Sequence, residues 1–232
     1  MKFFLITIIY FICGISHSAF AQVKKEEINY IYKDSIKGFS QSVFFETNKQ
    51  SMFYKNINSF GLSDFNKDSY INSLKYLQSN KISLTKKKTI VPSKEWITLK
   101  KYKGKFYAYH PCDFYDFYKV SINDSTYIDW TGEGALANRI LFQRQINDST
   151  FEVITTGILV KYRTIRITLI DIARGIAIFE EITRNKSPKY FLMIMADKIE
   201  SVGFIVNNCE IEKQFELNFE RPDFNKLLQD KL

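Results

Sequence analysis

The hexapeptide INDSTY at residues 122–127 recurs as INDSTF at residues 146–151, an offset of 24 residues. In each copy an apolar residue precedes Asn-Asp-Ser-Thr, whose short polar side chains favour tight turns by hydrogen-bonding the neighbouring backbone. A second and a third step of 24 residues reach Ile170-Asp171 and Ile194, which also precede turn-forming residues. One hairpin per 24 residues leaves about 12 residues for each strand with its turn, a spacing typical of all-β proteins. The period therefore predicts consecutive antiparallel hairpins.

The sequence around the repeat extends this pattern. Between Lys161 and Asp171, apolar Ile165, Ile167 and Leu169 alternate with polar side chains, as in a strand buried on one face. A long antiparallel meander leaves exposed edges unless it closes into a barrel. We therefore predict a mainly β fold at residues 93–220, an antiparallel up-and-down meander of about eight to ten strands, closed or nearly closed into a barrel.

The first 21 residues have the pattern of a secretory signal peptide. Lys2 precedes an apolar run from Phe3 to Ile15, and Ala19-Phe20-Ala21 supplies a small-x-small cleavage site. The alternative is a transmembrane anchor, but the run is short for a span of about 20 residues. We expect an exported protein, periplasmic or extracellular, that is not integral to a membrane after cleavage.

Two further segments flank the predicted barrel. Residues 22–92 read as a polar N-terminal extension with two short helices, one over about 24–40 and one from Asp68 to Asn80. Their apolar stripes are expected to pack against the barrel. Residues 221–232 form a polar C-terminal tail.

Removal of the signal leaves a small inventory of reactive side chains. The formal charge of the whole chain is +8, and its three Cys and two His fall to Cys112, Cys209 and His110 once residues 1–21 are gone. Two cysteines in an oxidising compartment are expected to form one disulfide, the alternative being two unpaired buried thiols.

These residues argue against most catalytic chemistry. A nucleophilic triad would depend on His110, and one His with two Cys cannot supply an ordinary structural zinc site. The sequence has no phosphate-binding glycine motif. Asp113, Asp116, Asp124 and Asp129 read as turn and surface residues. We therefore expect no catalytic residues, no metal and no cofactor.

Paired carboxylates remain an alternative, because glycoside hydrolysis needs only two acids. No pair stands out among the following candidates: Glu133, Glu152, Asp171, Glu180 and Glu181. An enzyme that uses two of them would need both acids in one cleft.

An aromatic stretch at residues 106–118 is the densest chemical feature of the chain. Tyrosine and phenylalanine offer broad apolar faces for a ligand, although core packing on alternate residues is the simpler interpretation. The candidate ligand-binding residues are Tyr107, Tyr109, His110, Phe114, Tyr115, Phe117 and Tyr118. Neighbouring lysines (86–88, 100, 101, 103 and 105) could meet an anionic envelope component or a protein partner. Nucleic acid is not expected, because the protein is exported and carries no recognition motif.

The stretch Lys103-Gly104-Lys105-Phe106-Tyr107 is similar to the opening Gly-x-Trp motif of lipocalins, with Phe106 in place of tryptophan. A long meander after an exported, helix-containing N-terminus also resembles the lipocalin and calycin barrels. An outer-membrane barrel competes with this interpretation, but charged residues are scattered through the strands and the tail is polar. The resemblance implies an apolar ligand in the barrel mouth. We expect a non-enzymatic binding protein for an apolar or amphiphilic ligand such as a lipid, or alternatively an interaction module without a small ligand.

Overall fold

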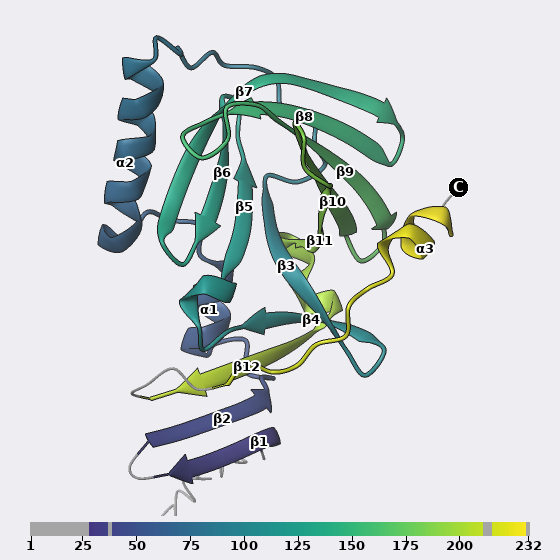
Figure 1. Ribbon diagram of the computed structural model, residues 1–232. Helices are drawn as coiled ribbons and strands as arrows, with labels where there is room; N and C mark the ends of the chain where they lie inside the picture. Colours follow the sequence, from purple (N-terminus) through teal and green to yellow (C-terminus); the bar gives the residue numbers. More distant parts are fainter. Residues whose placement is uncertain (1–27, 37–38, 211–214, 231–232) are drawn as a thin grey trace, which may run out of the picture.

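A computed structural model describes residues 28–36, 39–210 and 215–230 (Figure 1). The predicted signal peptide lies outside the described residues. In Figure 1 a barrel occupies the upper part of the molecule and a second sheet lies below it.

Eight antiparallel strands close the barrel, which confirms the predicted fold. Seven of them follow one another in the order β5 to β11, and pairs of β3 with both β5 and β11 close the ring, as in Trp96↔Val120 and Ile97↔Ile194. The barrel strands are β3 (Glu95–Tyr102), β5 (Tyr118–Ile122), β6 (Thr126–Thr131), β7 (Gly134–Asn147), β8 (Thr150–Thr156), β9 (Arg163–Asp171), β10 (Ile176–Thr183) and β11 (Lys189–Met195).

The 24-residue repeat forms equivalent turns. Asn123 Oδ1 accepts the N–H of Ser125 at 2.9 Å between β5 and β6, and Asn147 Oδ1 accepts that of Ser149 at 3.0 Å between β7 and β8. At the third position, Asp171 Oδ1 accepts the Arg174 N–H at 2.9 Å between β9 and β10. At the fourth, the chain enters the 3-10 helix η2 (Ala196–Ser201) and leaves the barrel. The side-chain oxygens of Asn123, Asn147 and Asp171 thus stabilise three hairpin turns, and none of these turns begins with glycine or proline.

Large side chains fill the barrel interior. Trp96, Tyr127 and Phe179 are buried within a cluster that also contains isoleucines from β7 and β9. The Trp96 and Phe179 rings meet edge to face at 5.0 Å between centroids. The interior is therefore a packed core, as in other small barrels.

The second sheet contains segments that were predicted as a helix or as part of the barrel. Its order is β1 (Asn29–Ile36), β2 (Phe39–Phe45), β12 (Gly203–Cys209), β4 (Lys105–His110) and the far half of β3. The helix predicted over about 24–40 is wrong for the described residues, because β1 and β2 form an antiparallel hairpin there. Apolar residues at helical spacing can also occur on a strand. Here the pairing of β2 with β12 favours the strand over the helix.

Within residues 93–220, β4 and β12 pair in parallel in this second sheet. Residues 215–219, which were predicted to belong to the barrel, lie outside any strand. Extended chain here contacts β3 through one bridge, Lys101↔Glu220.

Helices cover the outside of the barrel. The second predicted helix is confirmed as α2 (Asp64–Ser79), which begins earlier than Asp68 because Ser63 caps it, and ends at Asn80 as expected. Ser73 Oγ accepts the Ala137 N–H at 2.9 Å and fastens α2 to β7. The remaining helices are α1 (Met52–Asn58), η1 (Phe114–Asp116) and α3 (Phe224–Gln229). Among the described residues, no helix has the length and apolar character needed to cross a bilayer.

A buried lysine joins α1 to the barrel. Lys119 is 2% exposed, and its Nζ lies 2.6 Å from the Ser59 carbonyl oxygen, 3.0 Å from that of Ile57 and 3.3 Å from that of Asn56. Burial lowers the pKa of Lys119 to about 7. Even the neutral amine has two N–H groups for the two nearer carbonyls at the end of α1, so the contact persists in both protonation states.

Candidate functional site

The candidate ligand-binding residues are distributed over three environments. Tyr107 and Tyr109 pack within the second sheet, where the Tyr109 ring meets Phe219 at 4.6 Å. Tyr118 points into the barrel and donates a hydrogen bond to Asp129 at 2.8 Å, and its burial raises its pKa well above the usual value. Core packing therefore accounts for these three tyrosines.

The other predicted residues lie around the disulfide. Tyr115 is 67% exposed on η1, and the side chain of Phe114 lies outside the described part of the chain. His110 and Phe117 share a groove of about 550 Å³ between the barrel and the second sheet. The residues that line this "His110 groove" are Phe65, Asn66, His110, Pro111, Cys112, Phe117, Thr131 and Gly132.

The His110 groove is apolar, and its histidine is largely buried. Burial lowers the pKa of His110, and its buried Nδ1 has no hydrogen-bond partner among the described residues. The His110 ring packs edge to face against Phe53 at 5.2 Å. With Cys112 held in a disulfide, neither residue is arranged as a nucleophile with its base.

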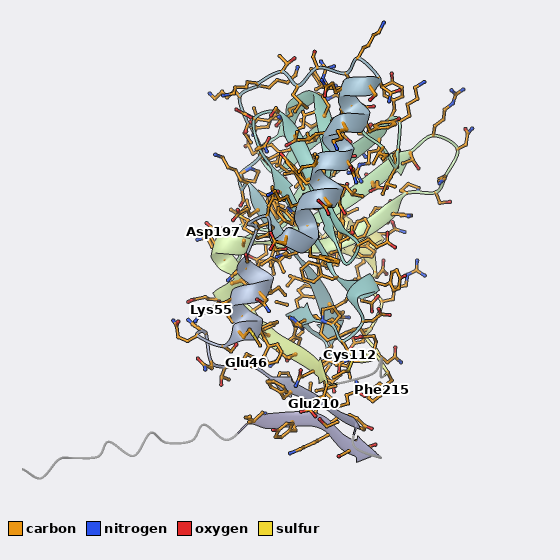
Figure 2. All side chains as sticks on the ribbon, turned by 90° about the vertical axis from the view of Figure 1, so that its left-hand side faces the viewer. Glu46, Lys55, Cys112, Asp197, Glu210 and Phe215 are labelled. Carbon is orange, nitrogen blue, oxygen red and sulfur yellow. A yellow bond between two sulfur atoms is a disulfide. The ribbon has the colours of Figure 1, made fainter. Side chains whose placement is uncertain are left out.

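The predicted disulfide is present between Cys112 and Cys209, whose Cα atoms are 5.6 Å apart. It joins the segment after β4 to the end of β12, and Figure 2 shows Cys112 above Glu210 and Phe215 at the foot of the molecule. A disulfide fits an oxidising compartment, as expected for an exported protein.

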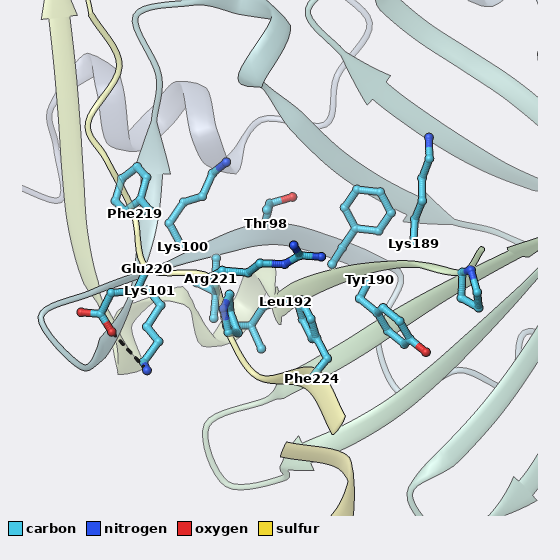
Figure 3. Close-up of a pocket in the computed structure, with 14 residues that line it drawn as sticks. Thr98, Lys100, Lys101, Lys189, Tyr190, Leu192, Phe219, Glu220, Arg221 and Phe224 are labelled. Carbon is cyan, nitrogen blue, oxygen red and sulfur yellow. Dashed lines mark ion pairs between the residues drawn. The ribbon is translucent and has the colours of Figure 1, made fainter. Parts of the chain in front are cut away.

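A second groove lies where β3 leaves the barrel (Figure 3). Its volume is about 520 Å³, and the segment after residue 218 crosses β3 and β11 to form one wall. The residues that line this "C-terminal groove" are Thr98, Leu99, Lys100, Lys101, Pro188, Lys189, Tyr190, Phe191, Leu192, Phe219, Glu220, Arg221, Pro222 and Phe224.

The C-terminal groove is positively charged. Among its lining residues, Glu220 is the one carboxylate, and it pairs with Lys101 at 3.1 Å. The Gly104 N–H and then Lys101 hold the pKa of Glu220 below its usual value. Lys100, Lys189 and Arg221 form no ion pair within the described residues, and Arg221 extends across the middle of the groove (Figure 3).

Aromatic rings give the same groove an apolar surface. Tyr190 and Phe224 stack at 5.3 Å between centroids, and the Tyr190 hydroxyl donates to Glu180 at 3.0 Å. Lys100 Nζ lies 5.9 Å from the centre of the Phe219 ring. The sequence did not reveal this site, because Phe219, Arg221 and Phe224 follow β3 by more than 100 residues. Phe219 was assigned to the barrel, and Arg221 and Phe224 to a polar tail.

The carboxylates considered for catalysis are mostly paired with arginines. Inside the barrel, Arg163 contacts Asp129 and lies 2.9 Å from Glu181. Burial alone would lower the pKa of Arg163, but Asp129 together with Tyr127 and Tyr118 outweighs burial and raises that pKa. On the outer face, Arg166 lies 2.8 Å from Glu180 and 4.0 Å from Glu152.

Two further acids lie in turns. Asp171 is 2.7 Å from Arg174, and Glu133 is exposed between β6 and β7. In the described part of the chain, no three His, Cys, Asp or Glu side chains are grouped to hold a metal ion. The absence of enzyme activity, metal and cofactor stays a prediction.

No family model, curated protein or solved structure matches this chain. The closed barrel of eight antiparallel strands is consistent with a lipocalin-like architecture. The residues that suggested the Gly-x-Trp motif, 103–107, form the β3–β4 turn and the start of β4 in the second sheet. The resemblance is therefore confined to the barrel architecture.

Proposed function

We propose that this protein is an exported, non-enzymatic binding protein for an anionic amphiphile, periplasmic or extracellular, and that the ligand occupies the C-terminal groove. The observation that carries the proposal is the combination of Lys100, Lys189 and Arg221 with stacked aromatic rings in one groove of about 520 Å³. Ligand sites of about 300–1,000 Å³ commonly combine an apolar lining with a few polar groups that orient the ligand.

The barrel interior is less suited to a ligand than the groove, because Trp96, Tyr127 and Phe179 occupy it. In the groove, an alkyl chain would lie on Tyr190 and Phe224, and an acidic headgroup would meet Arg221 and Lys100. Arginine suits this role because its planar guanidinium can bind a phosphate or carboxylate through two parallel hydrogen bonds.

Calorimetric titration with dodecyl phosphate tests the proposal, with dodecyl maltoside and inorganic phosphate as comparison ligands. We expect dodecyl phosphate to bind most tightly, because it alone offers both a chain and an anion. The double variant Lys100→Gln, Arg221→Gln should weaken binding by at least about tenfold, the equivalent of one lost charged hydrogen bond.

Lys226→Gln is the matched control, because Lys226 is exposed on α3 and lies outside the groove lining. This variant should bind dodecyl phosphate as the wild type does. Equal affinity of the wild type for dodecyl maltoside and dodecyl phosphate, or an unchanged affinity in the double variant, would refute the proposal.

The alternative is a protein-interaction module without a small ligand. The filled interior favours it, as does the apolar His110 groove, whose lining residue Phe65 is 66% exposed. It predicts no heat of binding for dodecyl phosphate or for either of the two comparison ligands.

A further inference from the structure

The loop between β8 and β9 presents apolar side chains to solvent. Ile158 is 41% exposed, Leu159 73% and Tyr162 61%. The loop is tightly held, because the Gly157 N–H donates to the Val160 carbonyl at 3.0 Å. A Cβ at Gly157 would lie 1.9 Å from Asn138 Oδ1, so the close approach to β7 requires glycine. The exposed apolar side chains are therefore presented from a fixed turn.

Basic residues lie within this loop and in the turn beside it. The register Thr183↔Arg163 between β9 and β10 places the β10–β11 turn beside it. Lys161, Arg184, Lys186 and Lys189 are all exposed. We call residues 157–162 with 184–189 the tip surface.

The tip surface contains no Asp or Glu in either segment. The nearest acid along the chain, Glu181, is 14% exposed and paired with Arg163 inside the barrel. Another acid, Glu133, is exposed in the β6–β7 turn at the same end of the barrel. The cations of the two tip segments therefore have no carboxylate within their own segments to neutralise them.

We propose that the tip surface docks the protein on an anionic lipid bilayer. Apolar side chains ringed by Lys and Arg are the chemistry that binds a membrane interface: the apolar groups enter the headgroup region and the cations meet lipid phosphates. The four cations favour an anionic surface, and Leu159, the most exposed of the three apolar side chains at 73%, is available to enter the headgroup region beside them.

Docking would also bring the C-terminal groove to the membrane. Pro188 and Lys189 belong to the tip surface and line that groove. A bound amphiphile could then pass between the bilayer and the groove, although docking itself requires no ligand.

Vesicle flotation of the mature chain tests the docking. We expect binding to phosphatidylcholine vesicles that contain about one quarter phosphatidylglycerol, no binding to pure phosphatidylcholine, and release at about 1 M NaCl, where charges are screened within about 3 Å. Arg184→Gln with Lys186→Gln should weaken partitioning about 25-fold, at about fivefold for each charge. Leu159→Ser with Tyr162→Ser should weaken it at least about tenfold.

The matched control lies in the β9–β10 turn at the other end of the barrel. Ile172 is 62% exposed and Arg174 lies two residues later, so Ile172→Ser with Arg174→Gln changes the same residue types. This control should partition within about twofold of the wild type. Circular dichroism of every variant checks that it is folded.

Equal binding to pure phosphatidylcholine, or unchanged partitioning in both tip variants, would overturn the inference. The tip variants should still bind dodecyl phosphate, and Lys100→Gln with Arg221→Gln should still bind vesicles. Failure of docking and failure of the proposed ligand site are therefore distinguishable.

Discussion

Replacing Lys119 by methionine tests how α1 is fastened to the barrel. Methionine has similar length but no N–H group, so the carbonyl oxygens of Ser59 and Ile57 lose donors at 2.6 and 3.0 Å. The third acceptor, the Asn56 oxygen, also receives the Ser59 N–H at 3.3 Å and is less affected.

The expected loss of stability follows from these contacts. Each buried carbonyl left without a donor costs about 1–3 kcal/mol, so two oxygens give a loss near 3 kcal/mol. For a domain of this size, that corresponds to a fall in Tm of about 6–12 °C. Hydrogen exchange should accelerate first in residues 52–58, because the lost bonds lie at the end of α1.

The pH dependence of stability adds a second readout. The folded pKa of Lys119, about 7, lies below the unfolded value of 10.5, so the unfolded chain binds more protons between these pH values. The wild type should therefore gain stability as pH rises from about 7 to 10.5, and the methionine variant should lack this contribution. The cost of Lys119→Met is consequently larger at pH 9 than at pH 6.

Urea unfolding with exchange measurements checks both effects. Lys75→Met on the exposed face of α2 is the matched control and should change stability by less than about 0.5 kcal/mol. If Lys119→Met lowered stability no more than this control, or if exchange in α1 were unchanged, the proposed fastening would be wrong.

Three further perturbations have defined outcomes. Replacing Cys112 and Cys209 by serine removes a bond between residues 97 apart in sequence and should lower the free energy of unfolding in urea by about 4 kcal/mol. An unchanged free energy would mean that the bond does not constrain the unfolded chain. Burial lowers the pKa of His110 in the folded protein, so the unfolded chain binds a proton first as pH drops below about 6.5. The free energy of unfolding should therefore fall with pH in this range, and His110→Asn should abolish that dependence in a pH series of unfolding curves. Arg163→Met leaves buried Asp129 and half-buried Glu181 without their cation and should cost about 3–5 kcal/mol, against less than about 1 kcal/mol for the more exposed Arg166→Met. Similar losses for the two variants would contradict the ion cluster.

The barrel could be predicted because its determinants are local. Turn formation by Asn123 and Asn147 depends on hydrogen bonds across two residues, and the alternation from Ile165 to Leu169 reflects one buried face. Both features are visible in a short window of sequence.

The aromatic stretch could not be resolved in this way. Neighbouring residues such as Tyr109 and His110 point to opposite sides of β4, and the next residues leave the sheet for η1. The aromatic side chains of this stretch are therefore divided between two packed cores and one groove. The predicted ligand-binding residues do not form a single site.

The antiparallel hairpins and the scarcity of catalytic side chains could be predicted from the sequence, because turn chemistry, strand alternation and composition do not depend on contacts between distant segments. For the disulfide, the sequence supplied Cys112 and Cys209 as candidates, and the fold brings them together. The folded protein was needed to show that residues 29–36 and 39–45 form strands and that residues 219–224 complete a cationic, aromatic groove on β3. The physical reason is that these features depend on pairings between segments more than 100 residues apart, whose partners no local pattern specifies.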